Sequence, residues 1–287
     1  MAIESAEGPF IINLAPTGAA PLSLLPPQVP LTPAAIIADV TRCVAAGAAM
    51  AHVHARDGQG EPAWQPEIHA EIIAGIRHNC PAVVIVASTT GRGGLSWEQR
   101  CAVLDLQGSA KPDMASLTLG SVTFSRGVAV NSLETMVRLA ERMQSVGIKA
   151  ELEVFDQGMV NMAHYLIRRG LLTPPYYFNL LLGNITTAQA RPDHLAALVN
   201  ALPEPAVWCV SGLGRTRRAG HALGLTWGHG VRVGLEDDLW LDDARQRPAT
   251  NRDLVAGVVE QGAALGRTPA TPAQVRSWLR LPAGRGA

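Results

Sequence analysis

Two histidines separated by one residue, His52 and His54, are the pair in this sequence best suited to bind a metal ion. They lie in the segment AHVHARD, at the end of an apolar run. If the run is a β-strand, side chains two residues apart point to the same side, about 6 to 7 Å apart along the chain, so both imidazoles can reach one cation. The alternative is a pair of core histidines bonded to neighbouring groups, which is costly where a partner is missing.

A carboxylate for the same cation is available in the segment VRVGLEDD, residues 231–238, where an apolar run ends in three acids. Two neutral imidazoles and the Glu236 carboxylate would leave a fourth position of zinc open, as in catalytic zinc sites. A solvated turn or a helix N-cap is the alternative for these acids, Asp238 above all. Glu236 and Asp237 can serve one site only if the chain bends there, because successive strand residues point to opposite faces.

Further polar side chains lie in or at the ends of the third, fourth and fifth apolar runs. They are Ser88, Thr89, Thr90 and Gly91, then Ser116 and Thr118, then Glu151 and Glu153. Buried carboxylates need a cation or hydrogen-bond donors, and Arg232 is a candidate partner for the two glutamates. A purely structural Glu–Arg pair at the base of the fold is the alternative.

Eight short apolar runs supply these positions, and longer segments with helical periodicity follow them. The runs span residues 10–15, 50–55, 83–88, 114–119, 149–155, 177–182, 207–212 and 231–235. Residues 32–46 and 132–146 are predicted helices. This alternation predicts a (β/α)8 TIM barrel, whose active site lies at the carboxyl ends of the strands and in which strand one borders strands two and eight. We expect a single catalytic domain over residues 1–287.

A dinucleotide-binding fold is disfavoured, because no G-x-G-x-x-G turn follows the first run and Gly212-Leu213-Gly214 is typical of an ordinary turn between strand and helix. A hydrophobic fraction of 47% excludes a disordered chain. The 24 basic and 24 acidic residues leave no net field for nucleic acid or an anionic membrane. Four widely spaced cysteines predict reduced core thiols. With no secretory signal or long apolar run, we expect a cytoplasmic protein that acts on small molecules.

Five segments together resemble the β-keto acid cleavage enzymes over about residues 10–279. They are PTG at 16–18, AHVHARD at 51–57, MASL at 114–117, ELEVFD at 151–156 and VRVGLED at 231–237. The resemblance implies a TIM barrel that condenses a β-keto acid with acetyl-CoA, giving acetoacetate and a new acyl-CoA. It also implies Zn²⁺ as the metal and a homo-oligomer, commonly a tetramer.

The resemblance also implies roles for residues that match the motifs. The zinc ligands would be His52, His54 and Glu236. The general base would be Asp237, positioned by Arg232 and Ser88, with Glu153 paired to the arginine. The contacts to the keto acid would be Ser88, Gly91, Ser116 and Thr118. Zinc bound by the keto oxygen and carboxylate would stabilise an enolate, and a nearby carboxylate would take the proton. The guanidinium would favour the charged form of Asp237, whereas burial would oppose it.

One position departs from the 3-keto-5-aminohexanoate cleavage enzyme, the best known member. Ala20 aligns with a glutamate of that enzyme, so a cationic amino substrate loses its most obvious partner here. Arg92 and Arg215 are candidates to bind a second carboxylate instead, unless they face solvent.

Two other functions remain open from the sequence. A metal-dependent lyase of the hydroxymethylglutaryl-CoA lyase kind also uses H-x-H, but it usually draws a carboxylate from near strand one, where residues 15–18 offer none. A non-catalytic barrel that binds a metabolite is the other, although no interaction module is attached. A requirement for acetyl-CoA separates a transferase from a simple lyase.

Overall fold

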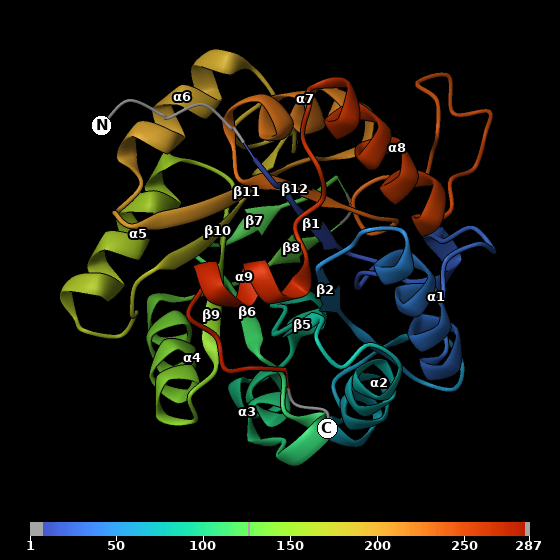
Figure 1. The fold of residues 1–287 in the computed structure, drawn as a ribbon. Helices are drawn as coiled ribbons and strands as arrows, with labels where there is room; N and C mark the ends of the chain where they lie inside the picture. Colours follow the sequence, from blue (N-terminus) through green and yellow to red (C-terminus); the bar gives the residue numbers. More distant parts are fainter. Residues whose placement is uncertain (1–7, 126, 285–287) are drawn as a thin grey trace.

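The computed structural model describes residues 8–125 and 127–284. Within them, eight parallel strands close into a barrel in the order β1-β12-β11-β10-β9-β6-β5-β2, with helices around it (Figure 1). The strands are β1 Ile11–Leu14, β2 Met50–Val53, β5 Val84–Ala87, β6 Met114–Thr118, β9 Lys149–Val154, β10 Tyr176–Leu182, β11 Ala206–Gly212 and β12 Gly230–Val233. Each lies within one or two residues of an expected run. The predicted TIM barrel is confirmed, as is the placement of β1 between β2 and β12.

The helices are α1 Pro33–Ala45, α2 Pro66–Asn79, α3 Trp97–Cys101, α4 Leu133–Ser145, α5 Gln157–Arg168, α6 Pro192–Ala201, α7 Arg217–Trp227, α8 Asn251–Ala264 and α9 Pro272–Trp278. Helices α1 to α7 lie between these strands in the chain, and α8 and α9 follow the last strand. Both helices expected from the sequence begin at a capping side chain. Thr32 accepts a hydrogen bond from the Ala35 N–H at 3.2 Å, and Ser132 accepts one from the Thr135 N–H at 3.1 Å.

The two ends of the barrel are built differently. Helix α9 lies across the amino ends of the strands (Figure 1), where Val275 and Leu279 pack with Ile11, Met50 and Met114. Two short hairpins follow strands at the opposite end: β3 Ala55–Arg56 with β4 Pro62–Ala63, and β7 Val122–Thr123 with β8 Val128–Ala129. The amino end is therefore closed by an apolar plug, and loops shape the carboxyl end.

In residues 8–125 and 127–284, every helix is too short or too polar to span a lipid bilayer. The four cysteines carry free thiols, and three of them are buried: Cys43, Cys101 and Cys209. Burial raises the pKa of the Cys43 and Cys209 thiols to about 12, so both stay protonated in the core.

Candidate active site

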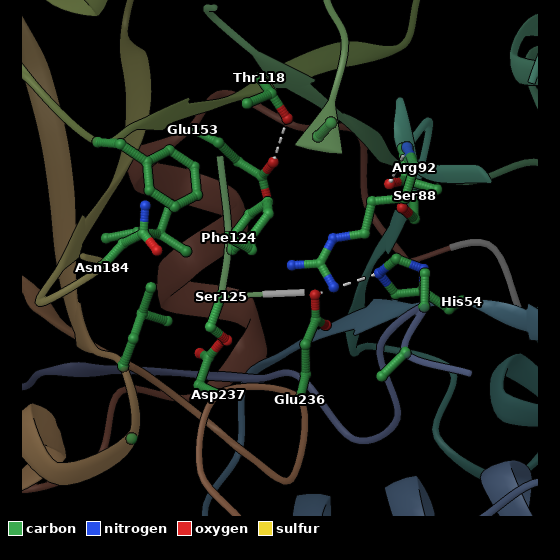
Figure 2. Close-up of a pocket in the computed structure, with 18 of the residues that line it drawn as sticks. His54, Ser88, Arg92, Thr118, Phe124, Ser125, Glu153, Asn184, Glu236 and Asp237 are labelled. Atoms are coloured by element: carbon green, nitrogen blue, oxygen red, sulfur yellow. Dashed lines mark hydrogen bonds and ion pairs between the residues drawn. The ribbon is translucent and has the colours of Figure 1, made fainter. Parts of the chain in front are cut away.

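A cavity of about 450 Å³ lies at the carboxyl end of the barrel (Figure 2). Its walls contain most of the residues singled out in the sequence, namely His52, His54, Ser88, Thr118, Glu153, Arg232, Glu236 and Asp237. Apolar side chains, among them Leu24, Phe124, Phe155 and Leu181, form other parts of the wall. A cavity with a few polar groups among apolar ones suits a small organic ligand.

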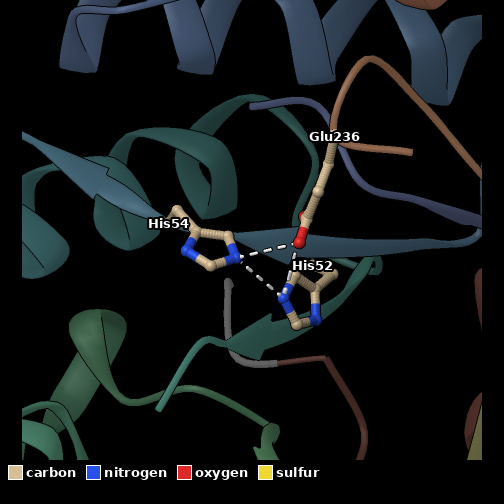
Figure 3. A group of neighbouring side chains, drawn as sticks. All are labelled: His52, His54 and Glu236. Carbon is tan, nitrogen blue, oxygen red and sulfur yellow. Dashed lines mark hydrogen bonds and ion pairs between the residues drawn. The ribbon is translucent and has the colours of Figure 1, made fainter. Parts of the chain in front are cut away.

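His52, His54 and Glu236 converge on one point of this cavity (Figure 3). The two Nε2 atoms are 3.2 Å apart. Glu236 places Oε1 3.3 Å from Nε2 of His54 and Oε2 4.0 Å from Nε2 of His52. The spacing of His52, in β2, and His54, just past its end, therefore turns both imidazoles to the same side, and the turn after β12, on the far side of β1, supplies the carboxylate.

The three side chains fit a divalent metal ion. Oε2 of Glu236 is buried and has no hydrogen-bond partner among the described residues. His52 uses its Nδ1 for Glu151, 2.6 Å away, which leaves Nε2 directed at His54 and Glu236. Two imidazole nitrogens and one carboxylate are the donor set of catalytic zinc sites with an open position.

Charge in this group is set by burial and by close partners. Burial raises the pKa of Glu236, but Arg232 and the two histidines outweigh it and hold that pKa well below its ordinary value. Burial lowers the pKa of His54 despite the nearby Glu236 carboxylate. An ionised Glu236 and a neutral His54 are the forms that bind a metal ion. For His52, burial lowers the pKa, yet Glu151 offsets this and leaves it above the ordinary value.

A turn after β12 brings Glu236 and Asp237 to the same cavity. The strand ends at Val233, two residues before the predicted end, and the N–H groups of Asp237 and Asp238 both donate to the Gly234 carbonyl, at 3.0 and 3.1 Å. Gly234 is needed here because a Cβ would lie 2.0 Å from the Ala15 carbonyl oxygen. The bend that lets both acids serve one site is thus present.

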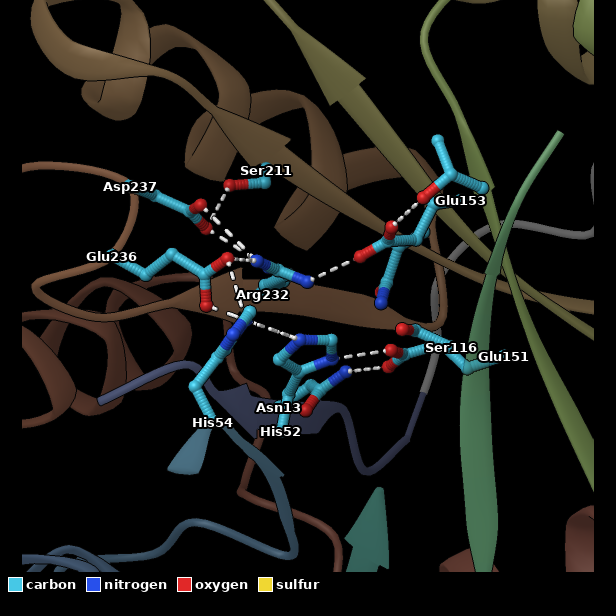
Figure 4. A network of polar contacts seen from close by, with 12 residues as sticks. Asn13, His52, His54, Ser116, Glu151, Glu153, Ser211, Arg232, Glu236 and Asp237 are labelled. Atoms are coloured by element: carbon cyan, nitrogen blue, oxygen red, sulfur yellow. Dashed lines mark hydrogen bonds and ion pairs between the residues drawn. The ribbon is translucent and has the colours of Figure 1, made fainter. Parts of the chain in front are cut away.

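Arg232 joins three carboxylates of the cavity (Figure 4). Its guanidinium lies 3.0 Å from Oε1 of Glu153, 2.9 Å from Oε1 of Glu236 and 3.1 Å from Oδ2 of Asp237. Burial lowers the pKa of Arg232, but Asp237, Glu236 and Glu153 raise it well above its ordinary value. The Glu–Arg pair expected from the sequence therefore forms at the carboxyl end of the barrel rather than at its base.

Beneath the histidines lies a polar chain that the sequence only partly indicated. Glu151, which shares a strand face with Glu153, accepts from Asn13 Nδ2 at 2.8 Å as well as facing His52. Asn13 also donates to the Tyr177 hydroxyl at 3.1 Å. The sequence reasoning missed Asn13 and Tyr177. The only signal was a polar atom within an otherwise apolar strand, which does not say where that atom points.

The residue that bonds Asp237 is a serine other than the expected one. The Ser211 hydroxyl, near the end of β11, donates to Oδ2 of Asp237 at 2.7 Å. Ser88 lines the cavity, but no hydrogen bond joins it to Asp237 among the described residues. Sequence reasoning missed Ser211, although it too ends an apolar strand.

The expected keto-acid contacts divide into two pairs. Ser88 and Thr118 line the cavity, and Thr118 donates to Oε2 of Glu153 at 2.6 Å. Gly91 and Ser116 are buried outside the lining. Ser116 accepts from the Thr89 N–H at 3.1 Å, and a Cβ on Gly91 would lie 2.6 Å from the Val130 carbonyl. These two positions support the wall behind the cavity.

The loop residues expected to control substrate choice do not all reach the cavity. Ala20 lines the cavity, in a loop held by Arg56, whose Nη2 donates to the Gly18 and Ala20 carbonyls at 2.8 Å. Arg92 lines the cavity too. Arg215 is exposed and lies outside the lining.

Known proteins agree with this fold. A model of the beta-keto acid cleavage enzyme family matches residues 9–281, and the chain belongs to that family. The resemblance inferred from the motifs is confirmed, and the protein is an enzyme of this class.

Two curated relatives match over nearly their whole length. A 3-keto-5-aminohexanoate cleavage enzyme of Fusobacterium nucleatum is 34% identical, over 95% of this chain and 98% of its own. A 3-oxoadipate:acetyl-CoA acetyltransferase of Cupriavidus necator is 33% identical, over 96% and 95%. Among solved structures, the binary complex of ObcA with oxaloacetate superposes with a TM-score of 0.77 at 25% identity, covering 89% of this chain and 68% of that one.

Proposed function

We propose that the enzyme exchanges acyl groups between a β-keto acid and acetyl-CoA, yielding acetoacetate and a new acyl-CoA. The observation that carries the proposal is the cavity in which His52, His54 and Glu236 converge beside a carboxylate, Asp237, that is held by Arg232 and Ser211. Curated relatives named for β-keto acid cleavage and for transfer involving acetyl-CoA support the same reaction.

His52, His54 and Glu236 would hold Zn²⁺, which when bound supplies a Lewis acid for the keto oxygen and carboxylate of the substrate. Asp237 is the general base. It faces the cavity, and the Arg232 guanidinium and the Ser211 hydroxyl fix its carboxylate at 3.1 and 2.7 Å. A base positioned in this way can accept a proton without rearranging.

The reaction then balances in three steps. Asp237 takes a proton from the carbon between the keto and carboxylate groups, and that carbon forms a bond to the acetyl carbonyl carbon of acetyl-CoA. The CoA thiolate moves from that carbonyl carbon to the substrate's keto carbon. The bond between the keto carbon and the carbon that Asp237 deprotonated then breaks. This releases the new acyl-CoA and acetoacetate, and Asp237 returns the proton. Ser88 and Thr118 are the proposed keto-acid contacts in the cavity wall; Gly91 and Ser116 would act by shaping that wall.

The cavity is proposed to prefer neutral or anionic β-keto acids over amino-bearing ones. Ala20 lines it at the position aligned with a glutamate, so no carboxylate is available there for an ammonium group. The carboxylates of Glu153, Glu236 and Asp237 are already paired with Arg232.

The test incubates purified, zinc-supplemented enzyme with acetyl-CoA and a panel of β-keto acids and identifies the products by mass spectrometry. We expect acetoacetate and the matching acyl-CoA in equal amounts, and no cleavage without acetyl-CoA. Cleavage without acetyl-CoA would instead indicate a lyase of the hydroxymethylglutaryl-CoA lyase kind. Stoichiometric zinc without turnover of any keto acid would indicate a metabolite-binding barrel.

Three features complete the proposal, and the last of them rests on family resemblance. They are a single catalytic domain over residues 1–287, a cytoplasmic location, and a homo-oligomer, commonly a tetramer. Light scattering on the purified protein measures the subunit number directly.

A further inference from the structure

Arg92 is a cavity cation without an acidic partner in the part of the chain that the structure describes. The other arginine of the lining, Arg232, is surrounded by three carboxylates. The Arg92 guanidinium forms no ion pair and no hydrogen bond with residues 8–125 or 127–284, and the residue is half-buried at the wall. Its N–H donors are therefore available to a ligand.

The guanidinium is held in place by aromatic stacking. It lies 3.8 Å from the centroid of the Phe124 ring, and Phe124 meets Phe155 edge to face, with centroids 5.9 Å apart. The three residues follow β5, β7 and β9, and the N–H of Val130, just after β8, donates to the Gly91 carbonyl at 3.3 Å, which ties the loop after β5 to the β7–β8 hairpin. Stacking occupies the face of a guanidinium and leaves its edge free for two parallel hydrogen bonds to a carboxylate.

The cavity therefore offers two different environments for a ligand. One contains the histidines and the three carboxylates gathered around Arg232. The other presents Arg92, a cation with no acidic partner among the described residues, stacked on Phe124 (Figure 2). Phe155 and Leu181 add apolar wall to the same cavity. A ligand that fills both needs a β-keto acid head, a short apolar chain and an anionic far end.

We infer that the physiological substrate is a β-keto acid with a second carboxylate at its far end, and that Arg92 is the residue that selects it. This inference rests on the proposed acyl transfer. The diphosphate of a CoA thioester is an anion of similar chemistry, so the test must separate it from the keto acid. Because Arg92 lines the same cavity as His52 and His54, beside apolar wall that suits a short keto-acid chain, the keto acid is the assigned partner.

Steady-state kinetics with 3-oxoadipate and 3-oxohexanoate test this, because the two acids share a chain length and differ in the terminal charge. We expect wild-type enzyme to prefer 3-oxoadipate. Arg92→Met should lower kcat/KM for 3-oxoadipate by about 10- to 100-fold, the range of a lost charge-assisted hydrogen bond, and change that for 3-oxohexanoate by less than about 2-fold. Arg92→Lys should restore only part of the loss, since lysine keeps the charge but not the planar fork. Arg215→Met is the matched control, because Arg215 is exposed and lies outside the lining. It should leave kcat/KM for both acids unchanged.

Equal losses of kcat/KM for both acids in Arg92→Met would overturn the inference and leave Arg92 as a packing residue. A rise confined to the KM for acetyl-CoA would overturn it in favour of the CoA diphosphate. Calorimetric binding of the two acids without acetyl-CoA adds a readout independent of turnover, and equal affinities in the wild type would also overturn it. Another outcome is that neither acid is converted but binding still depends on Arg92 and on the second carboxylate. The proposed acyl transfer would then be wrong, while the inference that the ligand carries a second carboxylate would hold.

Discussion

The two ends of the barrel both bury arginines with carboxylates, but in opposite proportions. At the amino end, Arg77 and Arg276 share one carboxylate, Asp113. At the carboxyl end, one arginine, Arg232, meets Glu153, Glu236 and Asp237. The first cluster has a surplus of positive charge and the second a surplus of negative charge.

The two surpluses have different surroundings. At the amino end most of the spare arginine donors bond backbone carbonyls, with Arg276 bonded to Ala82 at 2.7 Å and to Val83 at 2.8 Å, and Nη1 of Arg77 is buried without a partner among the described residues. At the carboxyl end Oε2 of Glu236 is likewise buried without a partner among those residues, but it faces His52 in the lining of the cavity. An enclosed cluster indicates a structural role, whereas a buried carboxylate oxygen beside imidazoles at a cavity indicates a ligand.

Removing the two histidines should give the largest effect on function and little effect on the fold. In the double variant His52→Ala/His54→Ala we expect bound zinc and turnover to fall to background, while the circular dichroism spectrum stays that of the wild type. The reason is that the alanines remove two of three ligands but leave β2 paired with β1 and β5. Metal analysis and circular dichroism check it, and full zinc occupancy in this variant would show the ligand assignment to be wrong.

The matching change at the amino end should affect the fold instead. Asp113→Ala leaves two buried guanidinium groups without their shared carboxylate, which should lower the free energy of unfolding by about 3–5 kcal/mol. Urea denaturation measures it. Asp243→Asn is the control, because the Asp243–Arg218 pair is exposed and 3.9 Å long, and its loss should cost about 1 kcal/mol or less. A loss no greater than in the control would contradict the structural role of the amino-end cluster.

The third change separates the general base from its neighbouring ligand. Asp237→Asn should lower kcat by about 100-fold or more and keep zinc, because the amide is nearly isosteric but cannot accept the proton. Glu236→Gln should weaken metal affinity first, since it removes the charge of the ligand. Zinc content and kcat of both variants decide between these roles. Near-normal turnover in Asp237→Asn would transfer the base role to another group, such as Glu153.

Alternation along strands accounts for what the sequence could predict. It placed His52 and His54 on the same face of their strand, and Glu151 and Glu153 on the same face of theirs. The order of the strands in the barrel placed β12 beside β1. Positions beyond strand ends depend on loop geometry instead. For that reason Ser211 rather than Ser88 bonds Asp237, Gly91 and Ser116 lie behind the wall, and only one of Arg92 and Arg215 reaches the cavity. The stack of Arg92 on Phe124 joins two loops and has no periodic signal.

The smallest effect expected comes from adding a carboxylate to the carboxyl end. Ala20→Glu introduces into the cavity wall the glutamate that the resemblance implies at this position of the 3-keto-5-aminohexanoate enzyme, where it would face an ammonium group of a substrate. We expect the ratio of kcat/KM for 3-keto-5-aminohexanoate over 3-oxohexanoate to rise by about 3- to 10-fold, the modest value of a partly hydrated ion pair.

Arg92 limits this gain, because it is a cation of the same cavity with no acidic partner among the described residues, and it competes for the new carboxylate. The double variant Ala20→Glu/Arg92→Met should therefore shift the ratio further than the sum of the two single changes in free energy. Ala20→Gln, with similar volume and no charge, is the control and should leave the ratio near that of the wild type. If Ala20→Gln raises the ratio as much as Ala20→Glu, the loop controls the substrate through its shape rather than its charge. In that case a charge at position 20 would not act together with the charge of Arg92 in selecting the substrate.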